Sequence, residues 1–171
     1  NIGHTFVEKI INLKNKENFL ITQNIDGLHQ RSGVPMDKII EIHGNATEAR
    51  CLNCGEKANI LDFHAAIKTN NPLPKCSNCD GIVKVATISF GQPMNENDML
   101  QASNISSQCD LMIVMGSSLS VMPAGQIPNL AIKSGAKIVI LNREETIYDA
   151  MANIVINDEL KIICKELIKL I

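Results

Sequence analysis

Apolar residues recur at helical spacing in several parts of this chain. Near its start they are Ile2, Phe6, Ile10 and Leu13, three or four positions apart, which predicts a helix with one apolar face. Two further helices are predicted over 124–134 and 145–151. A terminal helix is predicted after Asp158, whose side chain suits an N-cap. Its apolar positions include Leu160, Ile163, Leu167 and Leu170.

Short apolar runs lie between these helical segments. They are too short for typical helices and are expected to be strands, at 19–22, 39–42, 111–115, 137–141 and 154–156. The run Leu111–Met115 is apolar throughout, as expected for a strand covered on both faces. Strands that alternate with helices predict βαβ units. The expected fold class is therefore α/β, a Rossmann-like parallel sheet with helices on both faces.

Polar residues follow four of the predicted strands directly. They are Gln23, Asn24 and Asp26 after the first strand, His43 after the second, Gly116, Ser117 and Ser118 after the third, and Asn142 after the fourth. In open α/β sheets, ligands bind beyond the carboxyl ends of the strands. We therefore expect a ligand site built from these residues.

Four cysteines form two Cys-x-x-Cys pairs, Cys51/Cys54 and Cys76/Cys79, with 21 residues between the pairs. This spacing suits one tetrahedral zinc ion held by two knuckles, and four thiolates leave no open position, so the zinc is expected to be structural. Two disulfides are the alternative. The absence of a signal peptide and of a long hydrophobic span predicts a cytoplasmic protein, whose thiols stay reduced. A zinc-binding lobe is thus expected over 48–87, inserted in a nucleotide-binding domain of 1–47 and 88–171.

Composition and charge narrow the function classes. The chain has 171 residues, enough for one ordinary domain and a small lobe, and 45% of them are hydrophobic. The net charge of −2 gives no general attraction to nucleic acid or to anionic membranes. Charges in 48–87 are balanced, which disfavours a zinc ribbon that binds nucleic acid. Cys109 and Cys164 stand in apolar runs and are expected in the core.

Taken in order, the motifs resemble the sirtuins, which are NAD-dependent protein-lysine deacylases. The resemblance rests on Thr22 to His29, Ile42-His43-Gly44, the four cysteines, Phe90-Gly91, Gly116-Ser117-Ser118-Leu119 and Leu141-Asn142. It implies removal of acyl groups, expected to be acetyl, from lysines of proteins or peptides. The products would be nicotinamide and O-acyl-ADP-ribose, and the cofactors would be NAD and structural zinc.

The resemblance also assigns roles to individual residues. His43 would be the general base, assisted by Asn24, since an imidazole suits proton transfer at neutral pH. Residues lining the cofactor would be Gln23, Asn24, Asp26, Gly116, Ser117, Ser118 and Asn142. Residues pairing with an extended substrate peptide would be Ile88, Phe90 and Gly91. Without the resemblance, the same residues could form an Asx turn, a plain loop or part of the core.

The chain departs from the family pattern in some places. No Gly-Ala-Gly-x-Ser segment precedes the first predicted helix, so we expect the amino-terminal part of the sirtuin fold to be missing. Taken literally, the 171 residues are then expected to bind NAD poorly and to be inactive alone. Gln92 stands where the family usually has Glu, and Ser117 where it has Thr.

Two other functions stay open at this point. Protein ADP-ribosylation would use the same NAD site with a different acceptor. A catalytically inactive NAD-binding or scaffold protein would keep the fold, and the missing amino-terminal motif favours it, whereas the intact His43 and Asn24 argue against it.

Overall fold

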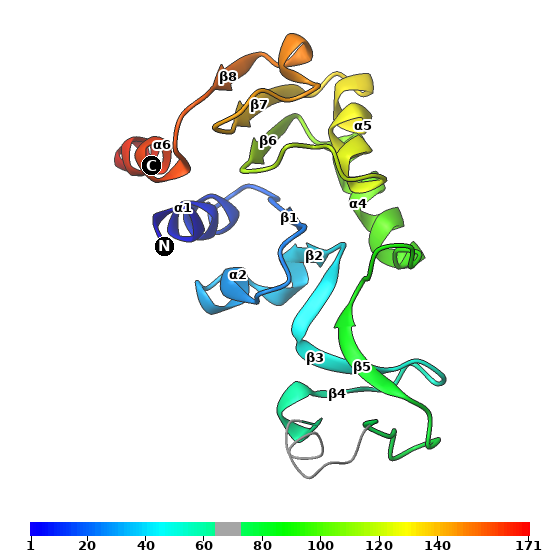
Figure 1. The fold of residues 1–171 in the computed structure, drawn as a ribbon. Coiled ribbons are helices and arrows are strands. Elements are labelled where there is room, and N and C mark those ends of the chain that lie inside the picture. Colours follow the sequence, from blue (N-terminus) through cyan, green and yellow to red (C-terminus); the bar gives the residue numbers. More distant parts are fainter. Residues whose placement is uncertain (64–72) are drawn as a thin grey trace. The chain divides into compact units, whose positions relative to one another are not determined.

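A computed structural model describes residues 1–63 and 73–171, and these fall into two compact units. Unit 1 consists of Asn1–Ile21, Leu28–Ile42 and Asn95–Ile171, and unit 2 of Thr22–Gly27 and His43–Met94. Figure 1 shows the elements of both. Residues 64–72, within the predicted lobe 48–87, lie outside the described residues. The predicted boundaries of that lobe stay a prediction.

The main sheet of unit 1 is parallel. Its strands are β6 (Leu111–Met115), β7 (Lys137–Leu141) and β8 (Ile154–Ile156), in that order. β6 pairs with β7 from Leu111↔Lys137 to Met115↔Leu141, and β7 pairs with β8 in the same direction. The three strands and their parallel arrangement are confirmed as predicted.

Side chains of alternate residues in these strands point to opposite faces of the sheet. Ile138 and Ile140 of β7 are fully buried in one cluster with Ala131 of α5 (Ile127–Lys133). Their neighbours Val139 and Leu141 point to a groove that is lined by apolar residues only. This groove is also lined by residues of α1 (Ile2–Ile11) and α6 (Leu160–Leu167), which contact each other. Helices therefore cover both faces of the sheet, as predicted (Figure 1).

A polar helix, α4 (Glu96–Gln108), was not predicted from the apolar pattern. The Asn95 side chain caps it by accepting a hydrogen bond from the Asp98 amide at 3.1 Å. Its buried side consists of the small residues Ala102 and Ser106, four positions apart and both 0% exposed. Small side chains let α4 approach α5 closely, so burial does not require the bulky residues that reveal most amphipathic helices.

The remaining elements of unit 1 are short. β1 (Leu20–Thr22) and β2 (Ile39–Glu41) form a two-stranded sheet, and α2 (Leu28–Arg31) follows β1. Single 3-10 turns are η1 (Met36–Lys38), η2 (Ala124–Gln126), η3 (Asp149–Met151) and η4 (Ile168–Leu170). The predicted helix over 124–134 thus divides into η2 and α5.

Two helix predictions were wrong in part. Only Asp149–Met151 of the predicted helix 145–151 is helical, because the Thr146 hydroxyl bonds locally to the Asp149 side chain and the Tyr148 amide. Asp158 does not cap α6, which starts at Leu160 after the cap residue Glu159. The Asp158 carboxylate instead accepts from the adjacent Glu159 amide at 2.7 Å.

The two isolated cysteines are placed largely as expected. Cys164 is fully buried, and Cys109 is partly buried against the cluster around Ile140. Burial raises the pKa of both thiols.

Unit 2 contains an antiparallel sheet. Its strands are β3 (Gly44–Cys51), β4 (Lys57–Asn59) and β5 (Val83–Thr87), with β3 in the centre. β3 pairs with β5 through Cys51↔Val83 at one end and Gly44↔Thr87 at the other. Its small core consists of Ala49, Cys51, Cys76 and Val83.

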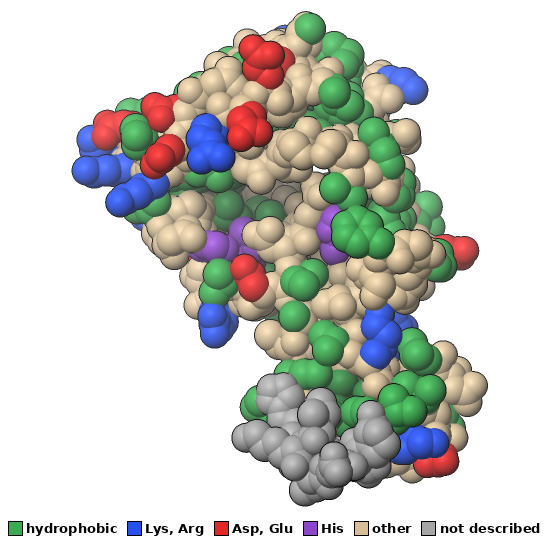
Figure 2. Space-filling model, viewed as in Figure 1, with side chains coloured by type: hydrophobic (Ala, Val, Ile, Leu, Met, Phe, Trp, Pro, Cys, Tyr) green, Lys and Arg blue, Asp and Glu red, His purple; other side chains and the backbone are tan. Residues whose placement is uncertain are grey.

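The surface of the described residues is of mixed charge. On the face shown in Figure 2, acidic and basic side chains are interspersed. One ion pair joins η4 to α6, with the Lys169 ammonium 2.6 Å from the Glu166 carboxylate. Within residues 1–63 and 73–171, none of the helices combines the length and the apolar character that a membrane crossing requires.

The core side of β7 is expected to control the stability of unit 1. Ile140→Ala should lower the free energy of unfolding by about 2–5 kcal/mol, because it leaves a cavity in a fully buried cluster. Ile154→Ala, on the groove side of β8 and 53% exposed, is the control and should cost less than about 1.5 kcal/mol. Urea unfolding of both variants checks this, and equal losses would contradict the assignment of the two faces.

Candidate functional site

The four cysteines of the two pairs come together in unit 2. Their Sγ atoms all lie within 4.8 Å of one another, with Cys51 Sγ 3.5 Å from Cys79 Sγ and Cys54 Sγ 3.6 Å from Cys76 Sγ. Four sulfurs around a tetrahedral zinc ion at about 2.3 Å would be about 3.8 Å apart. The donor set and the spacing therefore suit structural zinc. All six cysteines are free, so the disulfide alternative is not supported.

The two knuckles have matching backbone hydrogen bonds. In the first, the Cys51 carbonyl accepts from the Gly55 amide and the Cys51 amide donates to the Glu56 carbonyl. In the second, Cys76 makes the same two bonds with Asp80 and Gly81. Each pair thus folds into one tight turn that presents both thiols on the same side.

Asn53 is a residue of this centre that sequence reasoning missed. Its amide donates to Cys51 Sγ at 3.4 Å, and its side chain donates to Cys79 Sγ at 3.5 Å. The Asn53 side chain is the largest influence that lowers the pKa of Cys79, to about 6, and the Cys54 amide is the largest that lowers the pKa of Cys51. Thiolates are the form that binds metal.

The cluster does not ionise uniformly. The Glu56 amide acts to lower the pKa of Cys54, but hydrogen bonding to Cys79 and burial outweigh it and raise that pKa to about 12. Four adjacent thiolates repel one another, so a bound cation is what allows all four to be deprotonated together.

His43 lies between β2 and β3. Its Nδ1 is 3.2 Å from the Gln23 carbonyl oxygen, which can only accept a hydrogen bond. The proton of the neutral ring therefore belongs on Nδ1, and Nε2 keeps its lone pair for accepting a proton. The His43 carbonyl accepts from the Ile88 amide at 2.9 Å. His43 therefore links two other predicted site residues, Gln23 and Ile88.

The loop after β1 is fixed by its backbone. The Asn24 amide donates to the Thr22 hydroxyl at 3.1 Å, and the Ile25 carbonyl accepts from the Ala46 amide at 2.8 Å. The side chains of Asn24 and Asp26 remain exposed. The loop thus has a hydrogen-bonded backbone and exposed polar side chains.

Buried Asn45 supports the same region and was also missed. Its side-chain oxygen accepts from both the amide and the hydroxyl of Thr47, each at 2.6 Å. These two hydrogen bonds to one oxygen hold the start of β3, next to His43, in a defined turn.

The predicted substrate-binding residues directly follow the end of β5, which is an edge strand of its sheet. Ile88 is half-buried, whereas Phe90 is 100% exposed. The alternative that Phe90 is a core residue is therefore wrong.

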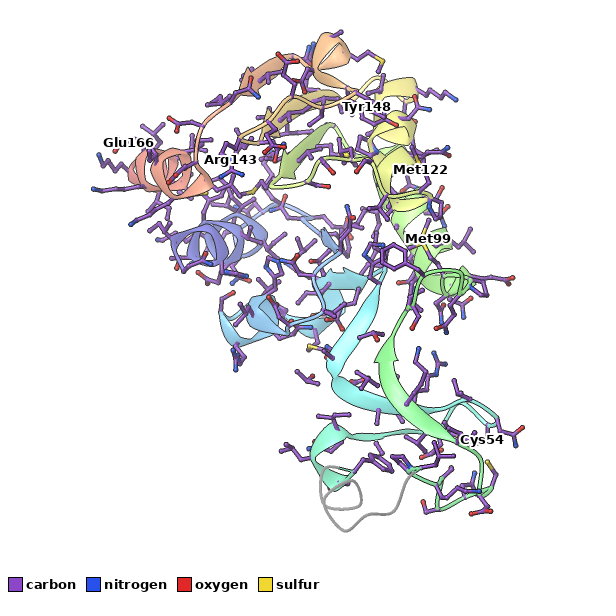
Figure 3. All side chains as sticks on the ribbon, in the orientation of Figure 1. Cys54, Met99, Met122, Arg143, Tyr148 and Glu166 are labelled. Atoms are coloured by element: carbon purple, nitrogen blue, oxygen red, sulfur yellow. The ribbon has the colours of Figure 1, made fainter. Side chains whose placement is uncertain are left out.

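A second group of predicted residues meets in unit 1, at the carboxyl ends of β6 and β7. A groove of about 410 Å³ brings together Gly116, Ser118 and Asn142. Residues of this groove that the motifs did not indicate are Arg143, Glu144, Asp158, Glu159, Leu160 and Lys161. Figure 3 labels Arg143 just beyond β7. In the sequence, only their position after strands β7 and β8 could have indicated these residues.

Backbone constraints shape this groove. A Cβ on Gly116, whose φ is +59°, would lie 2.8 Å from Leu160 Cδ1, so a larger residue would be strained at this φ and would require the Leu160 side chain to shift. The Asn142 side chain, 8% exposed, donates to the Glu144 carbonyl at 2.7 Å. The Ser117 hydroxyl accepts from the Leu119 amide at 3.2 Å. The helix that borders the groove is α6, through Leu160 and Lys161.

The predicted site residues thus form two groups. Unit 2 holds Gln23, Asn24, Asp26, His43, Ile88, Phe90, Gly91 and the four cysteines, and unit 1 holds Gly116, Ser117, Ser118 and Asn142. Their roles toward NAD and peptide stay predictions.

Removing one zinc ligand should remove the metal. The chain is expected to carry one zinc, and Cys76→Ser should lose it and unfold unit 2, because a hydroxyl is a poor zinc ligand. Cys109→Ser, outside the cluster, is the control and should keep the metal. Metal content by atomic emission checks both, and full zinc occupancy in Cys76→Ser would contradict the site.

Gly81→Ala should weaken the centre without touching a ligand. The new Cβ would lie 2.9 Å from Cys51 Sγ and 2.8 Å from Asn53 Cβ, and the crowding should cost about 1–3 kcal/mol. Gly3→Ala in α1 is the control, since alanine favours a helix. Zinc competition with a chromophoric chelator measures the effect, and unchanged zinc affinity in Gly81→Ala would refute it.

Comparison with known proteins identifies the family of this chain. The chain is similar to NAD-dependent protein deacetylase 1 of Bradyrhizobium diazoefficiens, with 48% identity over 82% of this chain and 55% of that protein. It is 45% identical to the NAD-dependent protein deacetylase of Rhodopseudomonas palustris over 82% of this chain and 56% of that protein. The chain thus spans little more than half the length of these relatives.

Solved structures agree over nearly the whole chain. A Sir2 structure described as a complex with a p53 peptide and NAD+ matches with a TM-score of 0.89 and 34% identity, covering 99% of this chain and 69% of that one. A Sir2 structure bound to a propionylated peptide matches with the same score. The sequence profile of the Sir2 family matches residues 1–123. This protein therefore belongs to the Sir2 family, the sirtuins.

Proposed function

We propose that the protein carrying this chain removes acyl groups, acetyl first, from lysines of proteins, using NAD. The products are nicotinamide and O-acyl-ADP-ribose. The observation that carries the proposal is the linkage of Gln23, His43 and Ile88 by two hydrogen bonds, which sets a base beside a substrate-binding strand end. Relatives named NAD-dependent protein deacetylases support it.

His43 acts as the general base in this proposal. The Gln23 carbonyl holds the ring in the tautomer with the proton on Nδ1, so Nε2 takes a proton from a ribose hydroxyl. The resulting imidazolium keeps its hydrogen bond to the same carbonyl. The backbone of Gln23 therefore orients the base before and after the proton moves.

The loop from Gln23 to Asp26 holds the nicotinamide and its ribose. Asn24 offers an amide to the carboxamide group, and Asp26 offers a carboxylate to hydroxyl groups. Because the Asn24 and Ala46 amides and the Ile25 carbonyl are engaged within unit 2, these side chains project from a fixed backbone. Such pre-ordering lowers the cost of orienting the cofactor.

The groove of unit 1 suits the adenosine end of NAD. The carboxylates of Glu144, Asp158 and Glu159 border it and can accept hydrogen bonds from ribose hydroxyls, as acidic residues do in other dinucleotide sites. Ser118 and Asn142 add neutral polar groups. Bound NAD supplies the glycosidic bond that breaks and the ribose that receives the acyl group.

The peptide is held by the segment Ile88–Gly91. β5 already pairs with β3, and the Ile88 amide extends that ladder to His43. A substrate strand that adds beside this segment gains affinity from backbone bonds and leaves its acyl-lysine to specify the reaction. Zinc stays structural, because four thiolates leave no open coordination position.

An assay with an acetyl-lysine peptide and NAD tests the proposal. The protein in the full length that its gene encodes should release nicotinamide and O-acetyl-ADP-ribose, both read by mass spectrometry. His43→Ala should lose at least about 100-fold in kcat, since it removes the base, while zinc content stays at one per chain. Asn142→Ala should raise KM for NAD.

Other outcomes identify the alternatives. ADP-ribosylated protein without the acetylated product would show an ADP-ribosyltransferase. Binding of NAD with zinc present and no turnover would show an NAD-binding or scaffold role. The same assay on these 171 residues alone tests whether they are inactive by themselves, as expected.

A further inference from the structure

The turn that follows the substrate-binding strand end is held by polar contacts and not by packing. Ser89, Phe90, Gly91 and Gln92 are all exposed, and Phe90 is exposed completely. A turn without a buried side chain depends on its hydrogen bonds for a defined shape. The groups that make those bonds therefore determine how this surface meets a peptide.

One side chain, Lys84 of β5, supplies the main contacts. Its Nζ lies 2.7 Å from the Thr87 carbonyl oxygen, 2.9 Å from Gln92 Oε1 and 3.5 Å from Ser89 Oγ. An ammonium group has three hydrogens to donate, and these acceptors match that number. Lys84 thus connects the end of β5 to both sides of the turn.

Gln92 closes the turn from the other side. Gln92 Oε1 also accepts from the Ser89 backbone amide at 3.3 Å, and the Gln92 backbone amide donates to the Ser89 carbonyl at 2.9 Å. The side-chain oxygen of Gln92 therefore joins the Lys84 ammonium to the backbone of Ser89. Removal of either partner opens the same small network.

The contacts of the Lys84 ammonium are all to neutral acceptors. Lys84 lies directly opposite Arg50 in the β3–β5 register, and like charges facing each other across strands destabilise a sheet. Arg50 turns away, with its Nε 3.3 Å from the Gly55 carbonyl. Among the ion pairs of residues 1–63 and 73–171, none includes Lys84. The Lys84 ammonium instead donates hydrogen bonds to neutral oxygen atoms of the turn.

We propose that Lys84, acting through Gln92, is a positioning residue that holds the segment Ile88–Gly91 ready for a substrate peptide. This inference rests on the proposed function. With the segment ordered in advance, the peptide does not have to fix it on binding, which improves affinity for the peptide. NAD binding and zinc binding use other side chains and do not depend on this network.

The first test is Lys84→Met in the full-length protein. KM for the acetylated peptide should rise about three- to tenfold, the loss expected for one or two partly exposed hydrogen bonds, with kcat and KM for NAD unchanged. Chymotrypsin should cleave after Phe90 faster, because the turn is looser. Unchanged zinc content and melting temperature show that unit 2 stays folded.

A matched pair at Gln92 gives the second test. Gln92→Leu removes the acceptor and should reproduce the effects of Lys84→Met on peptide KM and on cleavage. Gln92→Glu keeps an acceptor and adds a charge that pairs with the ammonium, so peptide KM should stay the same or fall. Added to Lys84→Met, Gln92→Leu should have little further effect, because both act on one network.

The outcomes separate this inference from the proposed function. If the unsubstituted protein does not turn over, the proposed function fails, and equal cleavage of both proteins after Phe90 would overturn the positioning role as well. If it turns over and Lys84→Met has the same peptide KM, only the positioning role is wrong. An equal rise in KM for NAD and for peptide would show a general disturbance and would also overturn it.

Discussion

The antiparallel pairing of β3 with β5 is the interaction on which the candidate site depends. At one end of the pair, Cys51 and Val83 face each other beside the four-cysteine centre. At the other end, Gly44 and Thr87 pair next to the bond from the Ile88 amide to the His43 carbonyl. A metal centre without an open coordination position can therefore matter for chemistry by keeping these two strands in register.

The parallel sheet of unit 1 obeys a different constraint. Strands running in one direction end at one edge, so polar residues that follow β6, β7 and β8 gather there without being close in sequence. The groove at that edge joins Gly116, Asn142 and Asp158. Residues of opposite charge line it together, which suits a ligand rich in hydroxyl groups better than one with a single strong charge.

Much of this arrangement could be predicted, and the misses have physical causes. Helix α4 was missed because it buries Ala102 and Ser106, which leave no apolar stripe. The helix expected over 145–151 is reduced to Asp149–Met151, because the hydroxyl of Thr146 offers the backbone a local alternative. Asn45 and Asn53 were missed because an asparagine that binds backbone or sulfur looks like any loop residue in sequence.

The sequence by itself determined the family, the α/β fold class, the strands of the parallel sheet and the four metal-binding cysteines. The strands follow from local periodicity and the cysteine cluster from fixed spacing, whereas the family follows from the resemblance of the motifs. Only the tertiary structure decided which groups touch. The tautomer of His43 depends on a carbonyl 20 positions away, and the Lys84 network depends on where a turn brings Gln92. Hydrogen bonds between distant residues leave no periodic signal, because they are set by how the chain folds back on itself.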